Sequence, residues 1–454
     1  LPKDFLHGYA SSAYQIEGGT SKGGRGPCNW DRMLSDYPDK GDDACRSYYL
    51  WEEDVKLLKQ YGCSSYRFSI SWSRIKPLGG KPDQVNEEGV EYYNKLINAL
   101  IAANIEPTVT LHHYDTPLEL ENRYCGFSAQ DPRHLIEDFV SYAEICFERF
   151  GDRVKRWLTI NEPWIFTSLA YEGLVERCTT ADFFRQVSLS LAVGHNTLLV
   201  HGYVVRLYRN KFQETQGGQI GIALNYDWVE PIDDSLEAKT AAEISESRSL
   251  GWFALPIFKG TQTGAWDHYG DLFPRLTKEE LDLLKGSADF FAINHYGTMY
   301  ATGKLHDPNT ATTFRDLDDV EKTHYRNGKP IGRLDAVPWG FKNLLIHCWN
   351  TYAKDLNMPV IVYENGYPVE HESKMVLADI INDTHRQEFF HLYIRAMCDA
   401  IKYHGVSMMG YHAWSLLDNL EWDNGYKPRF GVTYVDRDNG YKRIPKNSAK
   451  TLSK

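Results

Sequence analysis

The sequence lacks the features that define several large classes of protein. No run of about 18 uncharged apolar residues occurs, so a membrane-spanning helix is not predicted. The eight cysteines include no Cys-x-x-Cys pair and no grouping with histidine at metal-ligand spacing, so neither a zinc site nor a disulfide framework is indicated. Basic residues are the minority, 50 Lys and Arg against 61 Asp and Glu, and the net charge of −11 disfavours general binding to nucleic acid or to an anionic membrane. A neutral or cationic small molecule fits this charge better as a partner.

Linkers are missing as well, because no Gly/Ser-rich, Pro-rich or low-complexity stretch divides the 454 residues. Short apolar runs instead recur eight times along the chain, at residues 5–13, 65–71, 106–113, 156–161, 219–225, 290–296, 358–365 and 408–415. Stretches with helical periodicity lie between them, for example at residues 88–105, 132–151, 184–210 and 383–405. This alternation predicts parallel β-α-β units, and eight of them favour a single (β/α)8 TIM barrel, an α/β fold, that spans residues 1–454.

Polar or ionisable side chains occur in or directly after nearly every predicted strand. They are Arg67, His112, His113, Asn161, Glu162, Asn294, His295, Glu364 and Trp414. Each of them alone could merely satisfy a backbone group. Active sites of such barrels gather at the carboxyl ends of the strands, so the convergence of these side chains at one rim predicts a site there.

Two of these side chains are carboxylates in similar settings. Glu162 lies in "LTINEPW" and Glu364 in "VIVYENGY", each beside an asparagine at the end of an apolar run. A glutamate at the end of a strand can simply reach solvent or pair with an arginine. Two carboxylates that face each other across a barrel mouth are, however, the minimal equipment for glycoside hydrolysis, one as a proton donor and one as an ionised group near the anomeric carbon.

Five ordered motifs make the resemblance to a known family specific. They are "YQIEG" at 14–18, "YRFSISWSRI" at 66–75, "NEP" at 161–163, "ENG" at 364–366 and "WSLLDNLEWDNGYKPRFGVTYVD" at 414–436. Together they resemble glycoside hydrolase family one, the β-glucosidase family, and the match runs from about residue 4 to residue 450.

The resemblance implies a role for each catalytic position. Glu162 corresponds to the general acid/base and Glu364 to the nucleophile of a retaining double displacement, for which the carboxyl groups should lie about 5 Å apart. Arg67 and Tyr296 would contact Glu364 and favour its ionised form, and Asn294 would support the same site. The negative charge of Glu364 should in turn raise the pKa of Glu162.

The resemblance also implies a sugar-binding set. It comprises Gln15, His113, Asn161, Trp414, Glu421, Trp422 and Phe430, with Trp414 as a stacking floor. Amides, carboxylates and indole faces suit a neutral sugar, whose hydroxyls donate and accept while its C–H face is apolar. Glu421 would accept from two adjacent hydroxyls and repel a 6-phosphate, which disfavours the phospho-sugar branch. No metal and no organic cofactor is implied.

Several positions depart from the family pattern. Tyr114 stands where a tryptophan is usual, His7 also replaces a tryptophan, His412 replaces an aromatic residue, and Tyr363 replaces a threonine or serine. The stretch 171–184 replaces a glycine-rich loop. Because strand side chains alternate, Tyr363 is expected to point toward the surrounding helices, away from Glu364.

The predicted function is therefore a retaining β-glucosidase that acts on terminal β-D-glucosyl residues, with β-galactosides or β-fucosides as side substrates and with transglycosylation as a related reaction. The alternative is a non-catalytic carbohydrate- or receptor-binding relative, which the presence of both glutamates disfavours. Cysteines inside apolar-periodic stretches indicate free thiols, and no leader precedes the first strand, so a cytoplasmic location is expected. Oligomeric state is not predicted.

Overall fold

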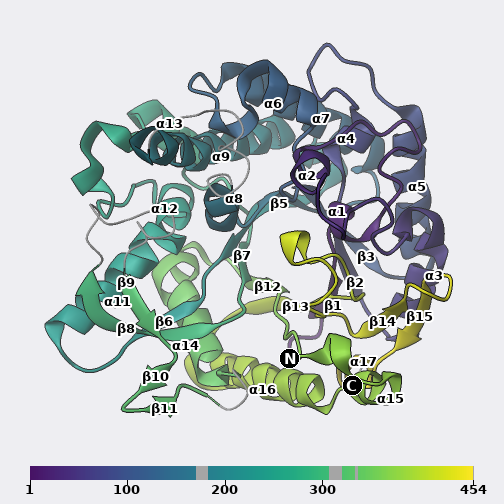
Figure 1. Ribbon diagram of the computed structural model, residues 1–454. Coiled ribbons are helices and arrows are strands. Elements are labelled where there is room, and N and C mark those ends of the chain that lie inside the picture. Colours follow the sequence, from purple (N-terminus) through teal and green to yellow (C-terminus); the bar gives the residue numbers. More distant parts are fainter. Residues whose placement is uncertain (170–182, 306–319, 333–335, 453–454) are drawn as a thin grey trace.

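Eight parallel strands close into a barrel in a computed structural model of the protein, which describes residues 1–169, 183–305, 320–332 and 336–452 (Figure 1). The strands are β1 (Leu6–Ala10), β2 (Ser65–Ser69), β3 (Glu106–His112), β4 (Arg156–Asn161), β5 (Gln219–Asn225), β7 (Phe291–Asn294), β12 (Val360–Glu364) and β13 (Met408–Trp414). Their order around the barrel is β1-β13-β12-β7-β5-β4-β3-β2. Each strand coincides with one of the eight apolar runs, so the predicted barrel is confirmed.

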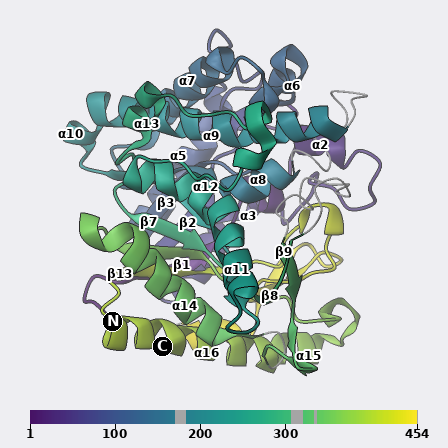
Figure 2. The ribbon, with the colours of Figure 1, turned by 90° about the vertical axis from the view of Figure 1, so that its left-hand side faces the viewer.

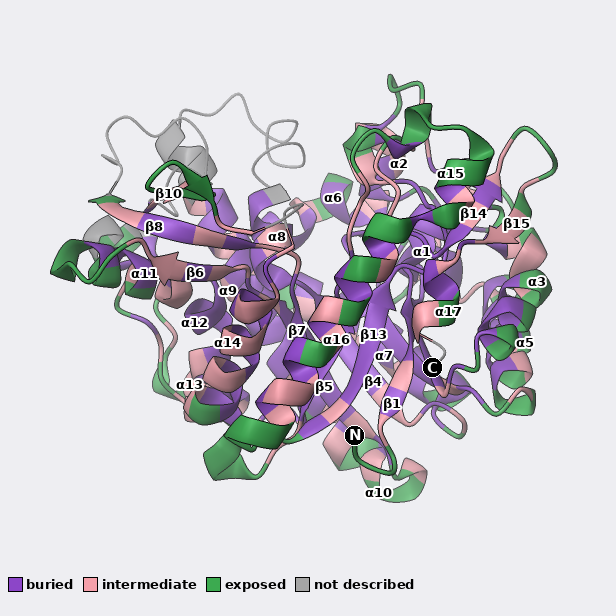
Figure 3. Cartoon of the chain, turned by 90° about the horizontal axis from the view of Figure 1, so that it is seen from below, coloured by how far each residue is buried: buried purple, intermediate pink, exposed green. Residues whose placement is uncertain are grey.

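Helices surround the strands (Figures 1 and 2). The four periodic stretches form α5 (Glu87–Ala102), α7 (Arg133–Phe150), α9 (Phe183–Lys211) and α16 (Thr384–His404). Helix α16 ends where Gly405 adopts φ +68°, the left-handed conformation that glycine accepts without a Cβ clash. In Figure 3 the central strands are buried, whereas α16 and α5 carry exposed residues on their outer side.

Further helices and three small sheets complete the described residues. The longer of these helices are α3 (Ser47–Gln60), α11 (Leu236–Arg248) and α14 (Pro338–Cys348). The shorter ones include α1 (Ala13–Ile16), α2 (Asn29–Met33), α4 (Trp72–Ile75), α6 (Leu118–Tyr124), α8 (Pro163–Leu169), α10 (Gln213–Gln216), α12 (Leu250–Ala254), α13 (Lys278–Leu284), α15 (Leu377–Asn382) and α17 (Ser448–Leu452). The small sheets pair β6 (Trp228–Pro231), β8 (Thr298–Leu305) and β9 (Val320–Thr323), then β10 (Tyr325–Arg326) with β11 (Lys329–Pro330), and β14 (Thr433–Asp436) with β15 (Lys442–Pro445). None of these three sheets was predicted.

Strand β12 departs from simple alternation just before it ends. Val360 and Val362 pack in the large helix-facing core, whereas Ile361 and Tyr363 belong to a separate small cluster with Leu158, Phe290 and Ala292. That cluster is the apolar filling of the barrel interior. The register with β7 shifts between Val362 and Glu364, so one extra residue is inserted there.

The bulge overturns one prediction. Tyr363 does not point toward the helices, because the inserted residue leaves both Tyr363 and Glu364 on the inner side of the barrel. The ring of Tyr363 lies 5.0 Å from the ring of His412, inside the barrel and close to Arg67.

A buried ion network joins α16 to segments near the end of the chain. Arg386 contacts Glu372 at 2.5 Å and Asp383 at 2.8 Å, and Lys446 contacts Glu372 at 2.8 Å and Asp418 at 2.9 Å. All five side chains are at most 7% exposed. Each charge therefore has an opposite partner out of solvent.

One hydrophobic core cluster extends from Tyr9 to Ala449. This continuity supports the prediction of one domain over residues 1–454, which stays a prediction. Among the described residues, no helix combines the length and apolar character needed to cross a membrane. The cysteines in the described part of the chain, Cys28, Cys45, Cys63, Cys125, Cys146, Cys348 and Cys398, are free thiols.

Candidate active site

The barrel delivers the predicted site residues to one rim. Glu162 directly follows β4, Glu364 and Asn294 end β12 and β7, and Trp414 ends β13. His113 follows β3. Because parallel strands present their carboxyl ends on one side, these residues gather at a single mouth.

Arg67 connects residues from several strands at this mouth. Its side chain is fully buried on β2 and donates from Nη1 to Oε1 of Glu364, from Nη2 to Oδ1 of Asn161 at 2.6 Å, and from Nε to Oγ1 of Thr110 at 2.8 Å. The hydroxyl of Tyr296 donates to Oε2 of Glu364 at 2.7 Å. Both oxygens of Glu364 thus accept hydrogen bonds, one of them from a cation, so the side chain is held in a fixed orientation.

Glu162 has a different environment. Its Oε1 accepts from Nδ2 of Asn294 at 2.9 Å, and its Oε2 lies 2.7 Å from the hydroxyl of Tyr114. Burial and the nearby charge of Glu364 raise the pKa of Glu162 to about 8, although the hydrogen bonds from Tyr114 and Asn294 act in the opposite direction. At neutral pH this carboxyl therefore holds a proton. The predicted rise in pKa is confirmed, with burial as its largest cause.

Asparagine side chains link the two carboxyl groups. Nδ2 of Asn294 donates to Oδ1 of Asn161 at 3.1 Å as well as to Glu162. The same Oδ1 accepts from Arg67, so a continuous hydrogen-bonded path runs from Glu162 to Glu364. The separation of about 5 Å between the carboxyl groups stays a prediction.

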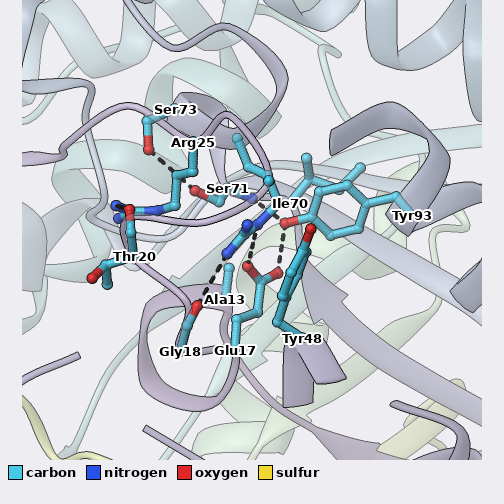
Figure 4. Close-up of polar contacts among 12 residues, drawn as sticks. Ala13, Glu17, Gly18, Thr20, Arg25, Tyr48, Ile70, Ser71, Ser73 and Tyr93 are labelled. Atoms are coloured by element: carbon cyan, nitrogen blue, oxygen red, sulfur yellow. Dashed lines mark hydrogen bonds and ion pairs between the residues drawn. The ribbon is translucent and has the colours of Figure 1, made fainter. Parts of the chain in front are cut away.

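Gln15 lies on the short helix α1, at the edge of the mouth. Its Nε2 donates to the carbonyl of Leu420 at 2.9 Å and lies 3.5 Å from Oε2 of Glu421. The residue after α1, Glu17, accepts from the hydroxyl of Tyr93 at 2.6 Å (Figure 4). It also accepts from Nε of Arg74 at 2.8 Å. These buried bonds fix the end of α1 and so hold Gln15 against the loop that carries Glu421.

Aromatic rings form one wall of the mouth. The ring of His113 is nearly parallel to those of Trp414 and Trp422, with centroids 5.8 Å and 6.1 Å away. Trp422 in turn packs against Tyr14 and Trp30. Burial and the charge of Arg67 lower the pKa of His113, which keeps the imidazole neutral. Its Nδ1 has no hydrogen-bond partner among the described residues, so it can meet a hydroxyl group of a ligand.

Glu421 and Phe430 complete the predicted set. Phe430 meets the ring of Tyr296 edge-on with 5.8 Å between centroids, beside the Glu364 carboxylate. Burial and the charges of Glu364 and Asp423 raise the pKa of Glu421 to about 8. A protonated Glu421 would repel a phosphate less than an ionised Glu421 would.

The departures from the family pattern have separate places in the structure. His7 contacts the carbonyl of Gly62 at 2.7 Å and Oγ of Ser64 at 3.1 Å, and His412 lies inside the barrel with Nε2 3.0 Å from Oγ of Ser65. Residues 170–182, which contain most of the unusual loop, lie outside the described residues.

The contact between the Tyr114 hydroxyl and Glu162 was missed. Its signal in the sequence was the departure itself, because a hydroxyl-bearing ring replaces an indole directly after His113. Three non-glycine residues of the site, Tyr114, Glu162 and Trp422, have positive φ angles of 72°, 41° and 52°. Such conformations cost about 1–3 kcal/mol each and persist only where the surroundings hold them.

A family model described as "Glycosyl hydrolase family 1" matches residues 1–454. The chain belongs to this family. As a family 1 member it is a glycoside hydrolase, as the motifs predicted. Among curated relatives, β-glucosidase 1B of Phanerodontia chrysosporium is 43% identical over 473 residues, with 100% of this chain and 85% of that protein covered.

Solved family 1 structures share the fold along the whole chain. A β-glucosidase of the fungus Humicola insolens in complex with glucose is 39% identical, with a TM-score of 0.92 and coverage of 100% of this chain and 97% of the other. A mutant rice β-glucosidase in a covalent complex with glucose is 36% identical, with a TM-score of 0.92 and coverage of 100% and 98%. Family membership and the barrel fold are therefore shown by sequence and by structure.

Proposed function

We propose that this family 1 member is a retaining β-glucosidase that hydrolyses terminal, non-reducing β-D-glucosyl residues. The unequal surroundings of its two carboxyl groups carry the proposal. Glu364 accepts hydrogen bonds from Arg67 and Tyr296, which suits an ionised nucleophile. Glu162 is buried with a pKa of about 8, which suits a proton donor at neutral pH.

In the first step a carboxylate oxygen of Glu364 attacks the anomeric carbon. The bond from that carbon to the leaving-group oxygen breaks, and the proton of Glu162 passes to this oxygen, so an alcohol departs and a glycosyl ester of Glu364 remains. Formation of the ester removes the charge of Glu364, which had raised the pKa of Glu162. The pKa of Glu162 is therefore lower in the intermediate than in the free enzyme, so the carboxylate left after proton donation stays ionised and is available to accept a proton.

In the second step Glu162 takes a proton from water while the water oxygen attacks the anomeric carbon. The ester bond breaks, Glu364 leaves as a carboxylate, and the sugar is released with its original anomeric configuration. An alcohol can replace water in this step, and the product is then a new glycoside. Transglycosylation thus needs no residue beyond those used for hydrolysis.

The side chains proposed to bind the sugar suit a neutral hexose. Asn161 lies beside Glu162, where a contact to the 2-hydroxyl strengthens as the oxocarbenium-like transition state forms. Gln15, His113 and Glu421 offer further polar atoms, and the Trp414 ring offers an apolar face. The relatives named above are β-glucosidases, which favours glucosides over β-galactosides and β-fucosides as main substrates.

The partner is accordingly a small β-glycoside or oligosaccharide. The free thiols of the described cysteines support a reducing compartment, and we infer a cytoplasmic location on that ground.

The decisive experiment measures turnover of p-nitrophenyl β-D-glucoside by two variants. Glu364→Gln should abolish turnover, because the amide cannot form the ester. Glu162→Ala should be crippled but partly rescued by azide, a nucleophile that needs no general base. Glu53→Gln is the matched control, because Glu53 is an exposed carboxylate on α3 that pairs with Lys56. Near-normal turnover by Glu364→Gln would contradict the nucleophile assignment, and a panel of nitrophenyl glycosides would identify the preferred sugar.

A further inference from the structure

Tyr114 brings a phenol into contact with the proposed acid/base. Its hydroxyl lies 2.7 Å from Oε2 of Glu162, and the side chain is 3% exposed. The ring is parallel to Phe166 of α8 with 5.9 Å between centroids, and Nδ2 of Asn29 donates to the Tyr114 carbonyl at 2.9 Å. The left-handed backbone, the stacked ring and the anchored carbonyl together fix where the hydroxyl lies.

The neighbouring amides settle which groups donate. Oδ1 of Asn161 faces Nη2 of Arg67, which can only donate, so Nδ2 of Asn161 must be the group that faces the Tyr114 oxygen at 3.1 Å. Nδ2 of Asn294 faces the same Oδ1 and therefore donates to Oε1 of Glu162. The Tyr114 oxygen already accepts one hydrogen bond, so whenever Glu162 is ionised the proton of Tyr114 is directed toward it.

The two oxygens of Glu162 consequently differ. Oε1 meets the Asn294 amide, which cannot accept a proton, whereas Oε2 meets a hydroxyl that can both donate and accept. The exchangeable proton of Glu162 therefore resides on Oε2. Tyr114 can accept from the protonated carboxyl and can donate to the carboxylate.

We propose that Tyr114 is a positioning residue that holds Oε2 of Glu162 in place through both protonation states and stabilises its carboxylate, so that it assists the change from acid to base between the two chemical steps. The inference deepens the proposed function and rests on it. A tryptophan at this position, which is usual in the family, has no oxygen to take this role.

Other charged and titratable groups also surround Glu162. Glu364 at the end of β12 is the nearest negative charge, Arg67 on β2 is the positive one, and Tyr296 after β7 is a second phenol. His113 is neutral through burial. Tyr114 differs from these groups because, among titratable side chains of the described residues, its hydroxyl alone is bonded to Glu162.

The test compares pH profiles of kcat/KM on an alkyl β-D-glucoside, whose poor leaving group needs the acid. Tyr114→Phe removes the donor to the carboxylate, so the alkaline limb should move up by about one pH unit, the effect of one hydrogen bond to a charged group. Tyr61→Phe is the matched control, because it deletes a buried tyrosine hydroxyl whose hydrogen-bond partner among the described residues is Oγ1 of Thr433, at 2.8 Å. Its limb should not move. An unmoved limb in Tyr114→Phe would overturn the proposal.

A second measurement protects the test against a folding defect. Site-specific incorporation of 3,5-difluorotyrosine at position 114 keeps the ring and strengthens the donor, so the alkaline limb should move to lower pH. An unmoved limb, or a shift to higher pH, would overturn the proposal. The Glu162→Ala variant distinguishes a failure of the proposed function from a failure of the role of Tyr114. If Glu162→Ala keeps its alkaline limb and shows no azide rescue, the proposed function fails; if it behaves as expected and neither change at position 114 moves the limb, only the role of Tyr114 fails.

Discussion

Arg67 places its guanidinium over the ring of Tyr363, with 5.9 Å between Cζ and the ring centre. The same guanidinium contacts Glu364 and Asn161 at its edges. A residue in the apolar filling of the barrel thus lies directly behind the group that holds the proposed nucleophile. Arg67 therefore contacts both the apolar filling of the barrel and the residues proposed to carry out catalysis.

We expect the position of the Arg67 guanidinium to depend on packing against the ring of Tyr363 and not on the Tyr363 hydroxyl. This hydroxyl faces Thr108 but forms no hydrogen bond of standard geometry with it, so Tyr363→Phe should change the thermal midpoint and kcat/KM far less than loss of the ring does. Tyr363→Ala should open a cavity and cost about 3–5 kcal/mol, as deletion of a buried aromatic ring does. Thermal unfolding and glucoside kinetics of both variants provide the measurement. Equal damage in the two variants would show that the hydroxyl is needed.

Arg67→Lys should reduce kcat/KM by about 10²–10³-fold, the typical effect of removing one preorganised donor. A lysine keeps the charge but cannot reach Glu364, Asn161 and Thr110 at once, because it lacks the planar fork. Steady-state kinetics on p-nitrophenyl β-D-glucoside would measure the loss. Arg149→Lys, in an exposed pair with Glu87, is the control and should retain full activity. Activity within twofold of wild type in Arg67→Lys would contradict this role.

The pH dependence follows from the raised pKa of Glu162. The first step needs this carboxyl protonated, and its pKa in the free enzyme is about 8, so kcat/KM should fall as pH rises through about 8. Because the pKa of Glu162 is raised, its active, protonated form persists to higher pH than the protonated form of an ordinary glutamate does. The alkaline limb should be absent in Glu162→Ala, measured beside the wild type on p-nitrophenyl β-D-glucoside. A limb that persists there would assign it to another group.

The ion network around Arg386 should dominate the stability of the α16 region. Arg386→Met leaves Asp383 without its buried cation and leaves Glu372 with Lys446 alone, which should cost about 3–5 kcal/mol. Lys56→Met, which breaks an exposed pair with Glu53, should not change the thermal midpoint measurably. Calorimetry of the two variants tests the contrast. A stable Arg386→Met variant would mean that the buried charges are solvated or protonated.

Much of this architecture could be predicted from the sequence. Apolar runs fixed the eight strands because a strand buried on both faces must be apolar, and polar residues at their ends fixed the rim. The bulge before Glu364 could not be predicted, because an inserted residue changes no local composition. The small sheets outside the barrel were missed because six of their seven strands have only two to four residues, and the longer β8 mixes polar and apolar residues without alternation. The Tyr114 contact depends on a left-handed backbone, which the sequence does not display at a non-glycine residue.

Arg67 links β2 to Thr110 of β3, Asn161 of β4 and Glu364 of β12. One side chain therefore connects its own strand to three other strands at the mouth of the barrel. If these strands separated, Arg67 would lose its hydrogen bond to Thr110, Asn161 or Glu364. A partly opened barrel should therefore not turn over substrate. Loss of catalysis on heating should then coincide with loss of the barrel itself, and residual activity can serve as a direct gauge of how much of the barrel is closed.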